Sequence, residues 1–359
     1  MNGKPYRRIL LTRMKFIGDV VLTTPAIRSV RTAFPDATIT YMGEKQAVSL
    51  LENNPCLDGI IPFDFSRPVF LEQPGVILKL RKAKFDLAID FFGNPRSALL
   101  TFLSGAKTRV GPDRKGRGNL YTIQVKDDGR PKKVTEFYNQ YLRAAGVEPS
   151  SDRTELFLTD DERREARIFL EWLDHETSPL DLTKPIIGLH PGATWPAKKW
   201  LPGRFAELAE LVRARLGCQV VMTAGPKDEE TLHEVVRSSF AGVKVLPALP
   251  LRQLAAVISH FNAYASNDAG PMHIAAALGI PTIGLFGPGQ EDIWFPYRES
   301  DGHTALRKDV PCHPCHLDVC NREGDGYMEC MKLLGVEEVF EAIRKGLTTT
   351  RNAKRETRK

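Results

Sequence analysis

Residues 263–288 read AYASNDAGPMHIAAALGIPTIGLFGP, and the pattern of this stretch indicates the fold class. It predicts a short strand that ends near residues 266–268, a tight turn at 269–271, a helix, and a fully apolar strand over 280–286. These elements form a β-α-β unit whose loop lies at the carboxyl end of the first strand. Open parallel sheets bind ligands at such loops. The stretch therefore predicts an α/β fold with a ligand site at this turn.

The turn has the chemistry of an anion site. Gly270 lets a ligand approach the backbone, and Pro271 suits the first turn of a helix. Free N–H groups at the helix start present partial positive charge, so a phosphate fits there. Two plainer interpretations stay open: a crossover turn in which Asp268 caps the helix, and a His273 packed in the core.

Length and composition describe an ordinary globular protein with two domains. The chain has 359 residues, which suits two domains of about 150 to 200 residues. The formal net charge of +6 is modest and does not predict that the whole protein binds nucleic acid. Residues 1–8 run directly into a strand, so no signal peptide is expected, and no apolar run approaches the roughly 20 residues of a membrane span. We therefore expect a cytoplasmic protein.

The first half of the chain alternates strands and helices, which favours a mainly parallel sheet. Strands are predicted at residues 8–12, 38–42, 59–63 and 86–91. After the first of them, the loop RMKFIG leads into the helix DVVLTTPAIRSVRTAF. Gly18 permits a tight backbone there. Asp19, at the helix start, is either an ordinary N-cap or a general base that faces a cleft.

The second half restarts the alternation after a polar stretch. Asp174 to Lys184 contains Pro179 and loses helical periodicity, so we place the interdomain linker there. Further strands are predicted at residues 185–190, 218–225, 243–246, 263–268 and 280–286. The sequence thus predicts two doubly wound domains without a sequence repeat between them. Their expected bounds are 1–178 and 179–346, followed by a basic tail at 347–359.

Three predicted loops of the second half follow strands: 191–199, 225–230 and 267–273. Because the carboxyl ends of parallel strands share one edge, these loops would lie together. Their polar candidates are Thr194, Lys198 or Lys199, Asp228 and the helix start at 270–273. Lysine and helix N–H groups suit a diphosphate, and a carboxylate suits ribose hydroxyls. The pattern outlines a nucleotide-diphosphate site, although Lys198 by itself would be an ordinary surface lysine.

Several familiar motifs are absent from the sequence. No two aspartates are separated by one residue, so the Asp-x-Asp metal arrangement of many sugar-nucleotide transferases is missing. Charge neutralisation would then fall to lysine, the helix dipole and histidine. The chain also lacks GxxxxGK[ST] and GxGxxG, which argues against an ATPase and a standard dinucleotide enzyme, and it lacks a GxSxG elbow.

Residues 107–133 carry nine Lys or Arg against three Asp and several glycines, and they are predicted to form mobile basic loops. Such a run is usually a solvated surface. Beside an active site it would attract a phosphorylated or carboxylated acceptor, with Lys107, Arg109 and Arg114 as candidates. Single-stranded RNA is a weaker interpretation, because only Tyr121 is available nearby for stacking.

Four of the six cysteines crowd together as Cys312-x2-Cys315-x4-Cys320-x9-Cys330. The opening CxxC has zinc-like spacing, whereas the later gaps are irregular. Two interpretations stay open: a structural zinc site, with nearby histidines as substitute ligands, and disulfides or free thiols. With the basic run, the cysteines also support a rival of a different class, a zinc-containing RNA-binding protein. That rival leaves Asp19 and the second-half loops unexplained.

Three ordered stretches resemble glycosyltransferase family 9, the ADP-heptose:lipopolysaccharide heptosyltransferases. They are IGDVVLTTPAIRSVR, HPGATWPAKKW and SNDAGPMHIAAALGIPTIGLFGP, and they span nearly the whole chain. The resemblance implies a GT-B fold of two Rossmann-like domains that face across a cleft. It also implies an inverting, metal-independent transfer of heptose from ADP-heptose to the inner core on lipid A, with no catalytic cofactor.

The resemblance also assigns residues. Asp19 matches the catalytic base in the GDV motif, and Lys198 matches the lysine that contacts the donor phosphates. Asp228 stands where an acidic residue holds the ribose, with Glu229 and Glu230 as alternative positions. The remaining donor-binding positions are Gly18, Thr194, Asp268, Ala269, Gly270 and His273. Ala269 replaces the threonine of some members, which leaves only a backbone contact there.

The expected partners are an ADP-sugar, a lipid A core acceptor (Kdo-lipid A or heptosyl-Kdo-lipid A) and, through peripheral contact, the inner leaflet of the membrane, with no nucleic acid. The basic tail would assist that contact or would be solvent-facing charge. A nearer rival is a transferase of the same fold that uses another nucleotide sugar. The sequence does not separate the heptose positions or give the oligomeric state.

Overall fold

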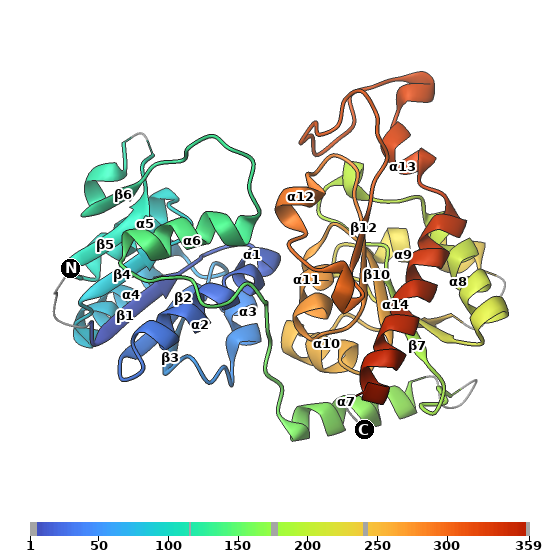
Figure 1. Ribbon diagram of the computed structural model, residues 1–359, viewed down its shortest axis with the longest axis horizontal. Helices are drawn as coiled ribbons and strands as arrows, with labels where there is room; N and C mark the ends of the chain where they lie inside the picture. The colour runs from blue at the N-terminus through green and yellow to red at the C-terminus, as the bar shows by residue number, and fades with distance from the viewer. Residues whose placement is uncertain (1–5, 115, 174–178, 240–242, 357–359) are drawn as a thin grey trace. The chain divides into compact units, whose positions relative to one another are not determined.

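A computed structural model of the protein describes residues 6–114, 116–173, 179–239 and 243–356. The chain divides into two compact units, Met1–Phe157 and Leu158–Lys359 (Figure 1). Each unit is built around one parallel sheet with helices between its strands, as the alternation in the sequence predicts.

The first unit contains a parallel sheet in the order β3-β2-β1-β4-β5-β6. Its strands are β1 (Arg8–Thr12), β2 (Thr38–Glu44), β3 (Gly59–Phe63), β4 (Leu87–Asp90), β5 (Thr108–Pro112) and β6 (Ile123–Val125). The last two fall in the basic run for which the sequence predicted mobile loops. That prediction was wrong, because Val110 of β5 and Tyr121, just before β6, are buried and anchor the run in the core despite its charge.

The helices of the first unit connect these strands and bury their apolar faces. They are α1 (Ile17–Leu22), α2 (Thr24–Ala33), α3 (Lys45–Val48), α4 (Val69–Ala83), α5 (Pro95–Leu103) and α6 (Val134–Ala144), with short 3-10 turns at Ser49–Leu51 and Gly118–Leu120. Proline near the start of α2 and α5 has the backbone angle that a first helical turn needs. In the core, Leu10 of β1 packs with Met42 of β2 and Ala88 of β4.

The second unit contains another parallel sheet, in the order β12-β11-β10-β7-β8-β9. Its strands are β7 (Ile186–His190), β8 (Gln219–Met222), β9 (Lys244–Val245), β10 (Ala263–Asn267), β11 (Thr282–Leu285) and β12 (Thr304–Leu306). The β-α-β unit predicted for residues 263–288 is present as β10, the following helix and β11. The edge strand β12 is too short and mixed in composition for its pattern to have been recognised.

Eight helices of the described part of the second unit cover this sheet and its edges. They are α7 (Asp160–Trp172), α8 (Pro202–Leu216), α9 (Glu229–Ser238), α10 (Leu251–Ile258), α11 (Gly270–Ala277), α12 (Glu291–Trp294), α13 (Glu329–Leu333) and α14 (Val336–Glu356), with 3-10 turns at Pro196–Lys198, Glu299–Asp301 and Gly324–Gly326. Side chains of α8 and α14 pack with Ile187 and Leu189 of β7 in one core. The helix α14, red in Figure 1, continues into the residues that were expected to form a separate basic tail.

The units divide earlier than the predicted boundary at 178/179, because α7 belongs to the second unit. Thr159 and Glu162 form a capping box at its start. Glu162 also accepts two hydrogen bonds from Arg252 of α10, at 2.5 and 2.8 Å. The amphipathic pattern of α7 predicted a helix but not the core against which it packs. Residues 174–178 of the proposed linker lie outside the described part of the chain.

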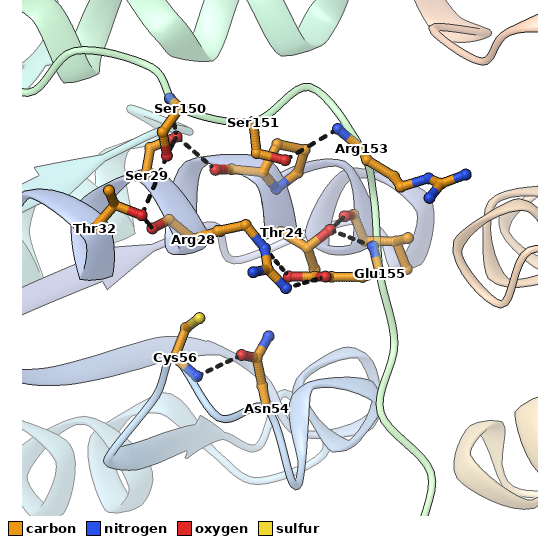
Figure 2. Close-up of polar contacts among 12 residues, drawn as sticks. Thr24, Arg28, Ser29, Thr32, Asn54, Cys56, Ser150, Ser151, Arg153 and Glu155 are labelled. Carbon is orange, nitrogen blue, oxygen red and sulfur yellow. Dashed lines mark hydrogen bonds and ion pairs between the residues drawn. The ribbon is translucent and has the colours of Figure 1, made fainter. Parts of the chain in front are cut away.

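The last residues of the first unit are fastened to α2 (Figure 2). The backbone N–H of Ser150 donates to Ser29 Oγ at 3.0 Å, and the backbone N–H of Glu155 donates to Thr24 Oγ1 at 3.1 Å. The Glu155 carboxylate also accepts from Arg28 Nε at 2.7 Å. Residues 150–155 are thus held against α2, up to two residues before the division.

None of the helices in the described residues is long and apolar enough to cross a membrane.

We predict that Gly188→Ala destabilises the second unit by about 1–3 kcal/mol, because added atoms in a packed core force side chains and backbone apart. A Cβ at Gly188, in the central strand β7, would lie 2.4 Å from Tyr264 and 2.5 Å from Phe261. Urea unfolding followed by tryptophan fluorescence measures this unit, since Trp172, Trp195, Trp200 and Trp294 all belong to it.

The matched control is Gly203→Ala in the first turn of α8, where a Cβ meets no atom within 4 Å. This variant should stay within about 0.5 kcal/mol of the wild type. Equal unfolding midpoints for the two variants would contradict the assigned packing of β7.

Candidate functional site

Each sheet has a point where the strand order reverses. In the first unit it lies between β1 and β4, and in the second between β7 and β10. Loops that leave neighbouring strands in opposite directions at such a point form a crevice at the carboxyl ends of the strands, where α/β proteins bind ligands. Most of the predicted site residues follow these strands, so each unit is described in turn.

In the first unit, Asp19 is held in place through both carboxylate oxygens. It belongs to α1, just after β1, and is only 8 % exposed. Its Oδ2 accepts from the backbone N–H of Phe16 at 3.0 Å, and its Oδ1 forms an ion pair with Arg13. The side chain of Phe16 is exposed, so the loop that holds Asp19 also reaches the surface.

Arg13 links this carboxylate to the loop after β4. Its Nη1 donates to the carbonyl of Phe91 at 3.1 Å, and its guanidinium lies 4.4 Å from the ring centre of Phe92. Burial acts to lower the pKa of Arg13, but neighbouring Tyr138 and Asp19 raise it above its ordinary value. Sequence analysis did not select Arg13. The available signal was a charged residue placed directly after an apolar strand.

Asp90 shapes the loop that receives Arg13. It ends β4, is fully buried, and accepts from the backbone N–H groups of Phe92 and Gly93 at 2.9 and 3.0 Å. Its other oxygen accepts from the Tyr121 hydroxyl at 2.7 Å. Burial raises the pKa of Asp90 despite these hydrogen bonds. This residue also escaped the sequence analysis, because a single Asp at a strand end is a weak signal.

In the second unit, Asn267 joins two of the predicted loops. It ends β10 and is fully buried. Its Oδ1 accepts from the backbone N–H of Trp200 at 3.0 Å, and its Nδ2 donates to the carbonyl of Pro191 at 2.8 Å. One amide side chain therefore fixes both ends of the loop that carries Thr194 and Lys198.

Lys198, on the loop after β7, pairs with Asp268. Its Nζ is 2.6 Å from Asp268 Oδ2 and 4.5 Å from the ring centre of Trp195. Asp268 is 8 % exposed, while Ala269 occupies the N-cap position of α11. The carboxylate of Asp268 therefore tethers the lysine, and the first turn of α11, from Gly270, begins beside this ion pair.

Asp228 joins the loops after β7 and β8. It stands at the N-cap position of α9, and its Oδ2 accepts from the backbone N–H of Gly225 at 3.1 Å. Its Oδ1 lies 3.5 Å from Lys199 Nζ. Gly192 is needed for this approach, because a Cβ there would lie 2.1 Å from the Asp228 carboxylate. Three of the predicted loops therefore converge at one edge of the sheet.

The other predicted donor residues vary in their surroundings. His273 is buried, and its Nδ1 lies 2.7 Å from the Tyr297 hydroxyl, so it packs among aromatic side chains near Phe295. Thr194 is exposed on the loop after β7. Gly18 is buried in α1 of the first unit, next to Asp19.

Two of the three acceptor candidates lie at the opposite edge of the first sheet from Asp19. Lys107 precedes β5 and Arg109 is its second residue, so both are at the amino end of that strand. Arg109 also donates to the backbone carbonyls of Leu120 and Ala106, at 2.8 and 2.7 Å. Arg114 follows the carboxyl end of β5 and shares the edge of Asp19.

The four clustered cysteines are free thiols. The sulfurs of Cys312 and Cys320 are hydrogen-bonded by Arg322 Nη1 at 3.7 Å and by the backbone N–H of Met328 at 3.3 Å. No group of three or more His, Cys, Asp or Glu within the described ranges is arranged to hold a metal ion. The structure therefore gives no support to the predicted zinc site.

The cysteine segment instead packs against the loops of the second unit. The carbonyl of Asp318 accepts from the N–H of Ala197 at 3.0 Å, and the N–H of His316 donates to the carbonyl of Pro288 at 3.0 Å. His313 Nδ1 lies 2.9 Å from the carbonyl of Gly287. Segment 312–330 thus supports the loop of Lys198 and the loop after β11.

Comparison with known proteins gives a consistent result. Residues 76–324 match the model of "Glycosyltransferase family 9 (heptosyltransferase)". The chain is 27 % identical to lipopolysaccharide heptosyltransferase 1 of Pseudomonas aeruginosa, over 87 % of each chain. It is also 27 % identical to lipopolysaccharide heptosyltransferase 2 of Escherichia coli K12, over 92 % of this chain and 99 % of that protein.

Two solved structures share the fold. The glycosyl transferase family 9 protein of Veillonella parvula superposes with a TM-score of 0.81 at 26 % identity, over 96 % of this chain and 98 % of that one. The E. coli ADP-heptose heptosyltransferase II superposes with a TM-score of 0.75 at 24 % identity, over 96 % and 99 %. The predicted GT-B class, with two doubly wound α/β units, is confirmed.

We predict that His190 makes the second unit sensitive to acid. It ends β7, is buried, and its Nδ1 lies 2.9 Å from Thr223 Oγ1. Burial lowers the pKa of His190 to about 4; Lys199 acts in the same direction and Asp228 opposes both. Between pH 6.5 and pH 4 the unfolded chain therefore binds more protons at this residue, and its contribution to stability falls as the pH falls.

Urea unfolding at pH 7.5 and pH 4.5, followed by tryptophan fluorescence, tests this expectation. His190→Gln should lose about 2 kcal/mol less stability between the two pH values than the wild type loses. Parallel losses in both proteins would contradict the assignment of a buried neutral imidazole.

Proposed function

Because the chain belongs to glycosyltransferase family 9, it is a glycosyltransferase of the GT-B fold, and we propose that it transfers heptose from ADP-heptose to the inner core of lipopolysaccharide. The observation that carries the proposal is the convergence of Lys198, Asp228 and the start of α11 at one edge of the second sheet. Positive charge and a carboxylate there match the diphosphate and the ribose of a nucleotide sugar.

The donor diphosphate binds between Lys198 and the first turn of α11. Both are sources of positive charge, because the positive end of the helix dipole lies at the first turn of α11. Asp268 forms an ion pair with the ammonium group of Lys198 before the donor binds. A phosphate of the donor then replaces the Asp268 carboxylate as the partner of this ammonium group. Asp228 accepts hydrogen bonds from the ribose. Lysine and helix start together stabilise the charge on departing ADP, a task that other transferases give to a metal ion.

Asp19 acts as the general base. As the acceptor hydroxyl oxygen attacks the anomeric carbon of heptose, its proton passes to the Asp19 carboxylate, and the bond from that carbon to the ADP oxygen breaks. A single displacement of this kind inverts the anomeric centre. Arg13 is a positioning residue, since it holds Oδ1 and ties Asp19 to the loop after β4.

The proposed acceptor is a lipid A core, either Kdo-lipid A or heptosyl-Kdo-lipid A, met at the cytoplasmic face of the inner membrane by peripheral contact. A transferase of the same fold that uses another nucleotide sugar is the second candidate, because none of the donor contacts above selects the sugar. The RNA-binding alternative is withdrawn, since the chain belongs to a family of transferases.

The proposal is tested by ADP release from ADP-heptose with a heptose-deficient lipid A core acceptor, with and without EDTA. We expect release by the wild type that EDTA leaves unchanged. Asp19→Asn should lower kcat/KM by about 100-fold to 10,000-fold, the usual contribution of a general base. Asp58→Asn is the control, because Asp58 pairs with Arg31 ahead of β3, at the amino end of that strand.

If EDTA stops ADP release, the transfer needs a metal ion, and the proposal of a metal-independent reaction is wrong. If Asp19→Asn and the wild type release ADP at equal rates, Asp19 is not the general base. If the wild type releases no ADP with acceptors of several core lengths, a panel of other nucleotide sugars decides between the two donor candidates.

The donor site has its own prediction. Lys198→Met should raise the Kd of ADP by roughly tenfold to a hundredfold, because a charged hydrogen bond is worth about 1.5–3 kcal/mol. Isothermal titration calorimetry measures this Kd. Lys184→Met, which removes an exposed lysine of the same unit, should leave it unchanged. If Lys198→Met has the same Kd for ADP as the wild type, Lys198 does not contact the diphosphate and the proposed donor site is wrong.

A further inference from the structure

Three loops at the carboxyl edge of the first sheet meet at one aromatic ring. Lys15 follows β1, Phe65 follows β3, and Arg96 lies in the first turn of α5, after β4. Lys15 Nζ is 4.1 Å from the ring centre of Phe65, and Arg96 Cζ is 5.0 Å from the same point. All three side chains are partly exposed. Two cations from distant parts of the sequence therefore share one surface.

Neither cation has a carboxylate partner among the residues that the structure describes. Other basic side chains of this edge do: Lys45 and Arg67 lie 3.4 and 3.8 Å from Asp64 Oδ2. Lys15 and Arg96 contact the face of Phe65 instead, which attracts a cation but does not neutralise its charge. The pair thus keeps unneutralised positive charge where its neighbours do not.

The two charges lie near each other. Since both lie within 5.0 Å of one ring centre, they are no more than about 9 Å apart. Two like charges this close repel each other, and a carboxylate or phosphate between them would turn that repulsion into two attractions. The apolar ring keeps water from one side of each cation, which strengthens its interaction with an anion.

The pair also adjoins Asp19. Lys15 directly precedes Phe16, whose backbone N–H donates to Asp19 Oδ2 at 3.0 Å. The loop that supplies Lys15 is therefore the same short loop that fixes the proposed base. A sugar that carries this anion would have its neighbouring hydroxyls near that base.

We propose that Lys15 and Arg96, across Phe65, bind an anionic group of the acceptor, either a carboxylate of an acidic sugar or a phosphate, and so direct its hydroxyl to Asp19. That the bound molecule is the acceptor rests on the proposed function. The anion site itself rests on the positions of Lys15, Arg96 and Phe65. It moves acceptor binding away from Lys107 and Arg109, which lie at the amino end of β5.

The first test is kinetic. Lys15→Met and Arg96→Met should each raise the KM for the lipid A core acceptor by roughly tenfold, the value of one charged hydrogen bond, and leave the Kd of ADP unchanged. Lys107→Met is the matched control and should keep the wild-type KM. Thermal unfolding monitored by circular dichroism verifies that each variant is folded. An increase in KM for Lys107→Met, with no effect in the other two variants, would overturn the proposal.

The second test measures binding without turnover. Isothermal titration calorimetry with the acidic sugar Kdo and, separately, with inorganic phosphate should show an affinity that falls at least tenfold in the Lys15→Met/Arg96→Met double variant. Loss for Kdo alone identifies a carboxylate as the anion, and loss for phosphate alone identifies a lipid phosphate. Equal binding of both probes to the wild type and the double variant would overturn the site.

The two proposals fail separately. If the wild type releases no ADP from ADP-heptose, yet its binding of Kdo or phosphate still depends on Lys15 and Arg96, the heptosyltransferase proposal falls and the anion site stands. If transfer proceeds and the double variant keeps the wild-type acceptor KM, the anion site falls and the heptosyltransferase proposal stands.

Discussion

Parallel strand pairing determines where the candidate site residues of both units lie. In each unit, six parallel strands bring all their carboxyl ends to one edge, and the reversal of strand order separates the loops there. Residues far apart in sequence, such as Arg13 and Phe91 or Lys198 and Asp268, meet only for this reason. The same pairing sends Lys107 and Arg109 to the opposite edge, where their charge cannot serve the same site.

Several charged side chains at these edges form ion pairs within the protein itself. Arg13 holds Asp19, Lys198 holds Asp268, and Lys199 lies beside Asp228. A buried charge without a partner is costly, so each catalytic candidate needs such a companion in the free protein. A substrate that brings its own charge can replace one member of a pair, as a diphosphate can at Lys198. Lys15 and Arg96 differ, because an aromatic ring takes the place of the carboxylate.

Sequence analysis predicted those features that follow from the pattern of neighbouring residues. Apolar strands followed by glycine and polar residues located both sheets and brought Lys198, Asp228 and Asp268 together. It missed Arg13, Asp90 and Asn267. Each of them has a hydrogen-bond partner 31 or more residues away in sequence, and a single charged or amide residue after a strand does not predict such a contact. The place of α7 was missed for the same reason, because an amphipathic helix shows which face it buries but not against which core.

Segment 312–330 also joins loops that are far apart in sequence, namely the loop of Lys198 and the loop after β11. Its cysteines suggested a metal, but its backbone explains its position better: it bonds Ala197, next to Lys198, and Pro288, after β11. Those two loops leave different strands, β7 and β11. A third segment that accepts from one loop and donates to the other holds both at a fixed separation. The position of the loop that carries Lys198, the proposed diphosphate ligand, therefore depends on a backbone hydrogen bond from a segment that contributes no proposed ligand of its own.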